Sequence, residues 1–565
     1  MHETGWALAG TSSMQALDRF SIESLGIPGE ILMESAGRAV LERVLAQLRA
    51  DSSRMRGEAE CEVLVVCGGG NNGGDGLVVA RHLHRLAVPV RVVAVSGCAA
   101  FRGDAAANLS RAVASGLPIQ DGGDAAGPEA ERRPVAGIIV DAVFGTGLNR
   151  DVEGLAGDWI RRINEARKTG AYVIAVDLPS GLDADTGAVL GVAVEADETV
   201  TFELPKPALA QEPGRSLAGS IRVARIGIAH EAPGVEIDTF LWSPSAAAHN
   251  LPERPAAGHK GSFGHVLVVA GSQGKTGAAH LSALGALRSG AGLVTLACPA
   301  GLADVLEVKT TEAMTVPVAD TSDRSFATAA EDTILALALE RDVIAMGPGV
   351  GTHPEARALM RSLAKRLDRP LVIDADGLNA FSEEEGLIAM LKGRSAATIL
   401  TPHPGEAARL LGCSGAEVNR DRVGSARALA EKSGAVVLLK GAASVIAEPT
   451  GRVWINPTGG PALAAGGTGD VLTGVTAAFL AQGAEAGRAA ALAAYVHGAA
   501  ADGLSRVMGE AGILASEVAE ALPSTIMQLR RESRASGRRF GKAGGREEES
   551  RERDGCALLL PFPGT

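Results

Sequence analysis

The sequence predicts an α/β fold in which parallel sheets are covered on both faces by helices. Short apolar runs without polar alternation, typical of strands buried on both faces, alternate with longer Ala-, Leu- and Arg-rich stretches typical of helices. Most runs end in Gly-, Asp- or Asn-rich loops, and ligands bind α/β proteins at such strand ends. At about 150 residues per domain, 565 residues allow two large α/β domains or three to four smaller ones.

Two groups of predicted strands define the domains. The first group is 61–67, 90–95, 137–143, 172–177 and 197–202, and the second is 265–271, 292–297, 342–346, 371–374, 397–401 and 435–439. Residues 230–258 are rich in Pro, Ala and Ser and show no helix or strand period, so we expect a linker at 236–257 between domains at 1–235 and 258–525.

The amino-acid composition of the chain changes after residue 525. Residues 526–565 are dominated by charge and glycine, and we expect them to be disordered. The final apolar run CALLLPFPGT (556–565) is either a docking peptide or an irregularity of the sequence.

Composition excludes several classes of protein. The net charge is −12 and aromatic residues make up 3%, which disfavours phosphate-backbone binding and base stacking, so we expect no nucleic-acid partner. Six cysteines without a CxxC pair indicate a reduced, cytoplasmic protein. No apolar run reaches 18 residues and no basic segment precedes an apolar one at the start, so we expect neither a membrane span nor a signal peptide.

Three polar loops follow strands of the first domain. They are GGGNNGGDG (68–76), DAVFGTGLNRD (141–151) and DLPSGLDADTG (177–187). A glycine loop before a helix exposes backbone N–H groups to an anion, and Asn and Asp oxygens suit a small cation and sugar hydroxyls. Each loop alone is as well explained by turns that cap a helix. The presence of all three loops at the ends of strands in one domain favours a ligand site.

These loops, with FELPKP (202–207), resemble the epimerase domain of the NAD(P)H-hydrate repair family over roughly residues 10–230. The resemblance implies a three-layer Rossmann-like fold that interconverts the R and S hydrates of NADH and NADPH. It implies that Asp177 relays a proton at the epimerising carbon and that Asn72, Asp141 and Ser180 bind potassium. The residues implied to bind the hydrate are Asn71, Asn72, Gly73, Gly74, Asp75, Gly145, Thr146, Gly147, Leu148, Asn149, Arg150, Asp151 and Asp177.

A second set of loops lies in the second domain. GSQGKTG (271–277), GPGVG (347–351), DADGLN (374–379) and TPHPGE (401–406) each follow a predicted strand, and AAGGTGDVLTG (464–474) leads into a helix. The backbone N–H groups of this last segment can stabilise the negative charge that develops on a phosphoryl group during its transfer. Asp470 either caps the helix or accepts the proton of an attacking hydroxyl. His403, between two prolines, is a ligand or a structural residue. No GxxxxGK[ST] phosphate loop is present.

GTGD with TPHPGE and the Lys440 segment resembles the ribokinase-like fold, in its ADP-dependent NAD(P)H-hydrate dehydratase branch, over about 255–525. The resemblance implies a three-layer αβα domain in which Asp470 deprotonates the 6-hydroxyl of the S-hydrate for attack on the β-phosphate of ADP, with magnesium on the phosphates. Residues implied to contact the hydrate are Ala278, Gly349, His403 and Asp470. Those implied to hold the nucleotide are Lys440, Gly441, Ala442, Ala443, Ser444 and Gly469.

Together the two resemblances predict a bifunctional enzyme, an epimerase and a dehydratase, that acts on hydrated NADH and NADPH and on ADP. We expect a homo-oligomer. The alternative is a hydroxymethylpyrimidine- or thiazole-type kinase fused to a non-catalytic Rossmann-like scaffold.

Overall fold

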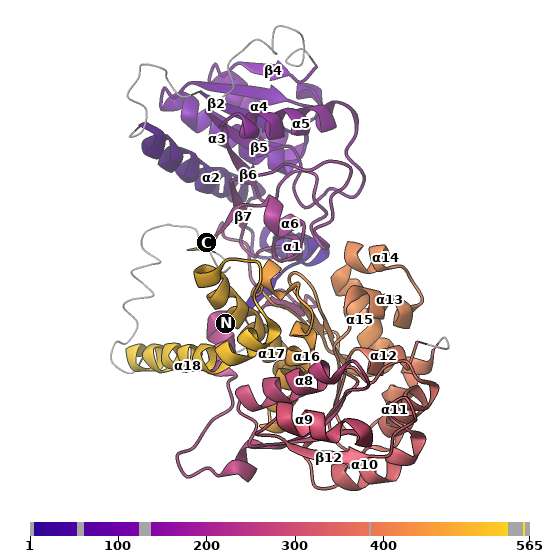
Figure 1. The fold of residues 1–565 in the computed structure, drawn as a ribbon. Helices are drawn as coiled ribbons and strands as arrows, with labels where there is room; N and C mark the ends of the chain where they lie inside the picture. Colours follow the sequence, from indigo (N-terminus) through magenta and orange to yellow (C-terminus); the bar gives the residue numbers. More distant parts are fainter. Residues whose placement is uncertain (1–4, 53–61, 124–136, 383–385, 541–557, 560–565) are drawn as a thin grey trace. The chain divides into compact units, whose positions relative to one another are not determined.

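The computed structural model describes residues 5–52, 62–123, 137–382, 386–540 and 558–559, and the chain divides into two compact units (Figure 1). The N-terminal unit contains Ala7–Ile237 and the described residues 558–559. The C-terminal unit starts at Asp238 and also takes up residues 5–6.

The N-terminal unit is built on an eight-stranded sheet. Its strands are β2 (Val63–Cys67), β3 (Val90–Ala94), β4 (Ile119–Asp121), β5 (Ile138–Ala142), β6 (Tyr172–Val176), β7 (Glu198–Phe202), β8 (Ser220–Ala224) and β19 (Leu558–Leu559). The order is β19-β8-β7-β6-β5-β2-β3-β4, parallel except that β19 pairs antiparallel with β8. The helices are α1 (Thr11–Glu23), α2 (Gly29–Ser52), α3 (Asn71–Arg85), α4 (Gly103–Ala114), α5 (Gly154–Lys168) and α6 (Gly214–Leu217).

Helices cover both faces of this sheet, as predicted from the apolar strand runs. On β2, Val63 and Val65 pack into a core formed with α2, α3 and α4, whereas Leu64 and Val66 pack into a second core formed with α5. Successive side chains of a strand point to opposite faces, so an uninterrupted apolar run can fill two cores. This gives the expected three layers.

The strand order reverses between β2 and β5. From β2 the chain moves to β3 and β4 on one side, then crosses back to β5, β6 and β7 on the other. Open α/β sheets bind ligands outside the carboxyl ends of the strands at such a switch point. The loops that begin at residues 68 and 143 both leave the sheet there.

The C-terminal unit is built on an eleven-stranded sheet. Its strands are β1 (Trp6–Leu8), β9 (Thr239–Leu241), β10 (His265–Val269), β11 (Leu293–Pro299), β12 (Met314–Val318), β13 (Val343–Met346), β14 (Leu371–Ile373), β15 (Thr398–Leu400), β16 (Val436–Leu439), β17 (Val445–Ala447) and β18 (Val453–Ile455). The order is β1-β9-β18-β17-β16-β15-β14-β13-β10-β11-β12. β10 to β16 pair in parallel, and β17 is antiparallel to both of its neighbours.

Helices of this unit connect the strands and cover the sheet. They are α7 (Pro244–His249), α8 (Thr276–Arg288), α9 (Ala303–Lys309), α10 (Glu331–Ala338), α11 (Pro354–Arg366), α12 (Asp376–Asn379), α13 (Pro404–Leu411), α14 (Gly415–Arg420), α15 (Arg422–Ser433), α16 (Thr468–Ala481), α17 (Ala486–Met508) and α18 (Ala515–Phe540). Here the strand order reverses between β10 and β13.

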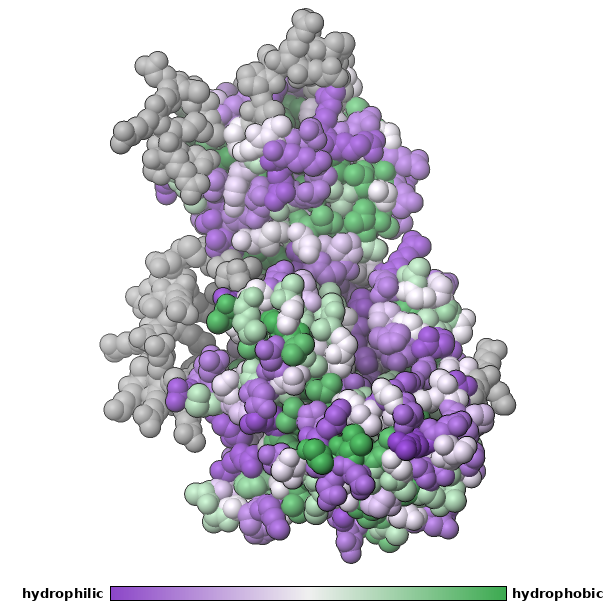
Figure 2. Space-filling view, in the orientation of Figure 1, coloured by the Kyte–Doolittle hydropathy of each residue, from purple (hydrophilic) through white to green (hydrophobic). Residues whose placement is uncertain are grey.

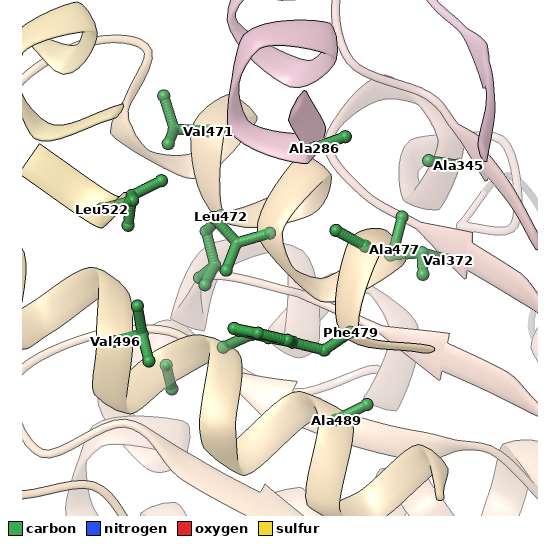
Figure 3. Packing of buried hydrophobic residues seen from close by; sticks show 14 of the residues in the cluster. Ala286, Ala345, Val372, Val471, Leu472, Ala477, Phe479, Ala489, Val496 and Leu522 are labelled. Carbon is green, nitrogen blue, oxygen red and sulfur yellow. The ribbon is translucent and has the colours of Figure 1, made fainter. Parts of the chain in front are cut away.

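Helix α16 is buried at the centre of the C-terminal unit. Figure 3 shows Ala477 beside Val372 of β14, and the ring of Phe479 next to α17. A Cβ on Gly474 would lie 2.0 Å from the carbonyl oxygen of Ser282, so α8 and α16 approach this closely only because residue 474 has no side chain. The packing fixes the N-terminus of α16 at the carboxyl ends of the strands.

Two expectations about the ends of the domains are wrong. The linker predicted at 236–257 contains β9 and α7, and the tail predicted to be disordered from 526 is helical as far as Phe540. β9 and α7 are too short to show a period, and their order comes from pairing with β18 and from burial of Ala246 and Ala247. In α18, Leu529 packs in the core of the unit, whereas Arg531 and Glu532 are exposed. The expected disorder at 541–557 and 560–565 lies outside the described residues.

The surface carries no extended apolar belt in the view of Figure 2, where hydrophilic and hydrophobic residues are interspersed. Within the described ranges, none of the helices combines the length and the apolar character needed to cross a bilayer.

Candidate active sites

The first predicted loop of the N-terminal unit forms the start of α3. β2 ends at Cys67, and the helix begins at Asn71 after Gly70 as its N-cap. A Cβ on Gly73 would lie 1.8 Å from the carbonyl oxygen of Gly68, so this turn is possible only with glycine at 73. Its free N–H groups and the helix dipole favour an anion at this position.

The three residues predicted to bind potassium surround the segment Val143–Gly145. Ser180 Oγ lies 2.6 Å from Asp141 Oδ1, the N–H of Ser180 donates to Oδ2 at 2.8 Å, and the N–H of Phe144 donates to Ser180 Oγ at 2.8 Å. A Cβ on Gly145 would lie 3.1 Å from Asn72 Oδ1.

Two features of this group fit a cation. The Nδ2 atom of Asn72 is buried without a hydrogen-bond partner, and rotating the amide by half a turn would place its oxygen there instead. Burial raises the pKa of Asp141 to about 6, although three hydrogen bonds favour its charged form. A bound cation would satisfy the amide oxygen and offset the cost of burying the carboxylate.

Asp177 follows β6 and pairs with a buried lysine that the sequence analysis did not select. Lys206 is 1% exposed, and its ammonium donates to Asp177 Oδ1 at 2.5 Å. The same oxygen accepts from Thr201 Oγ1 at 3.0 Å and from the N–H of Phe202 at 3.2 Å. Asp177 has a φ of +64°, a conformation that costs a non-glycine residue about 1–3 kcal/mol. The fold therefore holds this carboxylate in one orientation.

Asp75, the fifth residue of α3, is buried near Asp177. Burial first, and then the negative charges of Asp177 and Asp18, raise the pKa of Asp75 well above its ordinary value, while Lys206 opposes the shift. Asp75 and Asp177 are therefore close enough, together with Lys206, to influence one another electrostatically.

A cavity of about 550 Å³ lies beside the predicted substrate loop. Leu148, Arg150 and Asp151 of that loop line it, together with Ser96 after β3 and Asp121 at the end of β4. Gly147 and Asn149 are exposed, and Gly145 and Thr146 are partly exposed. The cavity therefore lies over the segments after β3, β4 and β5, and Asp75, Asp141 and Asp177 are not among its lining residues.

In the C-terminal unit, GGTGD forms the start of α16. Gly467 has a φ of +94°, Thr468 is the first helical residue, and residues 464–466 are exposed. Asp470 lies half-buried in the first turn. The exposed glycine loop can place its N–H groups around a phosphate.

Buried charges connect the predicted residues of this unit. Lys440 Nζ donates to Asp374 Oδ1 at 2.6 Å and lies 3.9 Å from Glu406 Oε2. Asp374 is 1% exposed, and its Oδ2 accepts from Thr473 Oγ1 of α16 at 2.6 Å. Burial alone would lower the pKa of Lys440, but these carboxylates raise it, so the ammonium stays charged.

Asp470 has the protonation behaviour of a base that works near neutral pH. Burial, and then the charge of Asp374, raise its pKa to about 7, while Lys440 opposes the shift. Asp376 raises the pKa further and Lys275 lowers it. Lys275 Nζ donates to Asp376 Oδ2 at 2.8 Å, which places the loops after β10 and β14 on the same site.

His403 caps α13. Its Nδ1 accepts from the N–H groups of Gly405 at 3.0 Å and Glu406 at 3.3 Å. The neutral ring then carries its proton on Nε2. The side chain is 51% exposed, so Nε2–H can reach a ligand. The structural and ligand roles of His403 are therefore compatible.

Ala278 and Gly349 lie against each other. A Cβ on Gly349, whose φ is +65°, would lie 2.9 Å from the Cβ of Ala278. Ser272 Oγ donates to the carbonyl of Gly349 at 2.7 Å. The loops after β10 and β13, on either side of the switch point, are thus joined.

A buried arginine supports the predicted nucleotide loop. Arg422 donates to the carbonyls of Leu439 and Lys440, both at 3.2 Å. A Cβ on Gly441 would lie 2.9 Å from this guanidinium. Beyond it, Ala443 has a φ of +53° and Ser444 Oγ donates to the carbonyl of Gly441 at 3.0 Å, while Ala442 is exposed. A Cβ on Gly469 would lie 3.4 Å from the Lys440 ammonium, so this loop and α16 share one site.

Comparison with known proteins gives consistent results for both units. Residues 266–524 match the family model described as NAD(P)H-hydrate dehydratase, and residues 29–208 match that of the YjeF-related protein N-terminus. The bifunctional NAD(P)H-hydrate repair enzyme of Moorella thermoacetica is 42% identical over 532 residues, which cover 93% of this chain and 97% of that one. The enzyme of the same name from Escherichia coli (strain K12) is 34% identical, covering 82% and 84%.

Among solved structures, the ADP/ATP-dependent NAD(P)H-hydrate dehydratase of Bacillus subtilis, co-crystallised with ATP/Mg²⁺, is 32% identical with a TM-score of 0.45, covering 51% of this chain and 98% of that one. The assignment of the chain to a family rests on the relatives that match both of its units in a single chain. The chain belongs to the family of bifunctional NAD(P)H-hydrate repair enzymes and carries an epimerase and a dehydratase domain.

Proposed function

We propose that the C-terminal unit uses ADP to dehydrate the S-hydrate of NADH or NADPH, and that the N-terminal unit supplies S-hydrate from the R epimer. One observation carries the first half of this proposal. Asp470, with a pKa of about 7, lies in the first turn of α16 next to the charged Lys440. A base, an N–H cradle and a cation therefore meet where a hydroxyl would attack a phosphate.

The dehydration proceeds in two steps. Asp470 accepts the proton of the 6-hydroxyl while that oxygen attacks the β-phosphorus of ADP and AMP leaves. Lys440 and the N–H groups of the glycine loop stabilise the charge that develops on the phosphoryl oxygens. Phosphate then leaves carbon 6 and water takes up the proton from carbon 5, which restores the ring double bond. Nε2–H of His403 and the surface of Ala278 and Gly349 orient the hydrate.

The two metals differ in how the protein would hold them. In the described part of the chain, no three His, Cys, Asp or Glu side chains gather to hold a metal. This fits magnesium carried by the nucleotide phosphates, the usual arrangement for this ion. Asn72, Asp141 and Ser180 would hold potassium, because one carboxylate with two neutral oxygens suits a hard monovalent ion. Potassium there would fix the loops after β2, β5 and β6.

The test uses chemically hydrated NADH, a mixture of epimers, with ADP or with ATP. We expect reduced-nicotinamide absorbance to return completely with ADP, and AMP to form in equal amount. Return of absorbance with ATP alone would contradict the proposed donor. Return of only the S portion at the enzymatic rate would contradict epimerisation by the N-terminal unit. Hydrated NADPH in a parallel assay shows which hydrate is preferred.

A further inference from the structure

The Lys206 ammonium in the N-terminal unit is fully occupied by protein groups. Its three hydrogens match three acceptors: Asp177 Oδ1 at 2.5 Å, Thr201 Oγ1 at 3.1 Å and the carbonyl of Phe202 at 3.1 Å. The side chain is 2% exposed. Lys206 therefore has no hydrogen left for a substrate, and it acts on a reaction through the acidic side chains beside it.

The two oxygens of Asp177 differ. Oδ1 accepts from Lys206, Thr201 and Phe202, whereas Oδ2 has no partner among the hydrogen bonds of the described residues. Asp177 thus keeps one oxygen, Oδ2, free to contact a ligand.

Asp75 provides the complementary group. It is 7% exposed, and no hydrogen bond to its side chain occurs within the described ranges. The charged or titratable groups that face it are Asp177, Asp18, Lys206 and the thiol of Cys67, which burial keeps protonated by raising its pKa. Burial and two carboxylates favour the neutral form of Asp75, so it can donate a proton.

The chemistry of a hydrated nicotinamide needs both groups. Its 6-hydroxyl lies on the carbon bonded to the ring nitrogen, so that carbon is a hemiaminal. Such a centre inverts when the hydroxyl proton is removed, the carbon–nitrogen bond breaks to give an aldehyde, and the nitrogen takes up a proton. Rotation about the carbon 5–carbon 6 bond and closure on the other face reverse both transfers. No oxidant or co-reactant is consumed.

We propose that Asp177 and Asp75 form the base and the acid of this ring opening, and that Lys206 is the positioning residue that holds the negative charge they share. The proposal rests on the epimerase function proposed above. When Asp177 takes the hydroxyl proton and Asp75 gives its own to nitrogen, the negative charge moves from one carboxyl group to the other. Lys206 acts electrostatically on both, so its charge stabilises the pocket before and after the transfer.

The first experiment compares Asp75→Asn with Asp18→Asn in the full chain. Purified R-hydrate is incubated with potassium and without nucleotide, so that no dehydration occurs, and S-hydrate is followed by chromatography. Asp75→Asn should lower epimerisation about 10²–10⁴-fold and remove the alkaline limb of the kcat/KM profile. Asp18→Asn, the matched control, should keep activity within about threefold and move that limb to lower pH, because it removes a charge that keeps Asp75 protonated.

The second experiment tests Lys206 through the pH profile. Lys206→Met should move the acid limb of the kcat/KM profile upward by about one pH unit or more, because the base loses the positive charge beside it. In an Asp177→Asn background the same substitution should change the residual rate by less than about twofold, since the base that Lys206 positions is already absent. Thermal unfolding checks that each variant folds.

The outcomes separate the two proposals. Wild-type rates for Asp75→Asn, or an unchanged acid limb for a folded Lys206→Met, would overturn the acid–base assignment. If Lys206→Met does not fold, the contrast between Asp75→Asn and Asp18→Asn decides alone. A parent chain that leaves R-hydrate unchanged would instead refute the proposed epimerase function.

Discussion

Dehydration should follow the ionisation of one carboxyl group, Asp470. Burial and the neighbouring Asp374 raise its pKa to about 7, and only the ionised form can accept the hydroxyl proton. About a tenth of Asp470 is ionised at pH 6 and about nine-tenths at pH 8, so kcat/KM should rise about tenfold across this interval. The same shift should make the folded unit less stable as pH rises from about 4 to about 7, because the folded state retains a proton that the unfolded chain releases.

Asp376→Asn tests the electrostatic origin of this shift. Asp376 raises the pKa of Asp470, so its removal should move the midpoint of the profile to lower pH by up to about one unit. Asp332, which is almost fully exposed on α10, serves as the matched control, and Asp332→Asn should leave the midpoint in place. The assay is the return of reduced-nicotinamide absorbance from purified S-hydrate with saturating ADP. A flat profile, or a midpoint that rises in Asp376→Asn, would refute the reasoning.

Four further predictions follow from the two sites and their supporting packing. Asp470→Asn should lower dehydration about 10²–10⁴-fold while ADP binding measured by calorimetry persists; turnover near that of the parent would exclude it as the base. Asp177→Ala should stop epimerisation, so that a mixed pool is repaired only in its S portion at first; rapid repair of both epimers would contradict this. Asp141→Asn should reduce the dependence of epimerisation on potassium, and a crystal soaked in potassium salt should show the ion only in the parent. Gly474→Ala should lower the free energy of unfolding by about 1–3 kcal/mol in denaturant titrations, because its Cβ would meet the Ser282 carbonyl.

The central strands could be predicted because each is a continuous apolar run, which indicates burial without reference to distant residues. The run predicted at 435–439 is β16 at Val436–Leu439, and that at 172–177 is β6 at Tyr172–Val176. In contrast, β17 and β18 were missed. Each has only three residues, and their antiparallel pairing beside β16 is a long-range effect that no window of sequence shows.

Site residues were predictable where a loop directly follows a strand. Ser180 stands in such a loop and Asp141 is the last but one residue of β5, and the structure gathers the two within hydrogen-bond distance. Lys206 and Asp374 were not selected, although FELPKP and DADGLN were noted. A lysine between two prolines just after a buried strand, and an acid immediately after another, were the available signals.

The sequence alone determined the two-domain α/β organisation, the central strands and the loops that carry polar chemistry, because each depends on neighbouring residues. The tertiary structure determined which charged side chains contact one another. Lys206 reaches Asp177 across 29 residues and Lys440 reaches Asp374 across 66, through the order of parallel strands. The charges brought together in this way shift the pKa values of Asp75 and Asp470, because burial and nearby charge act through space. Only the folded chain therefore distinguishes the acid from the base.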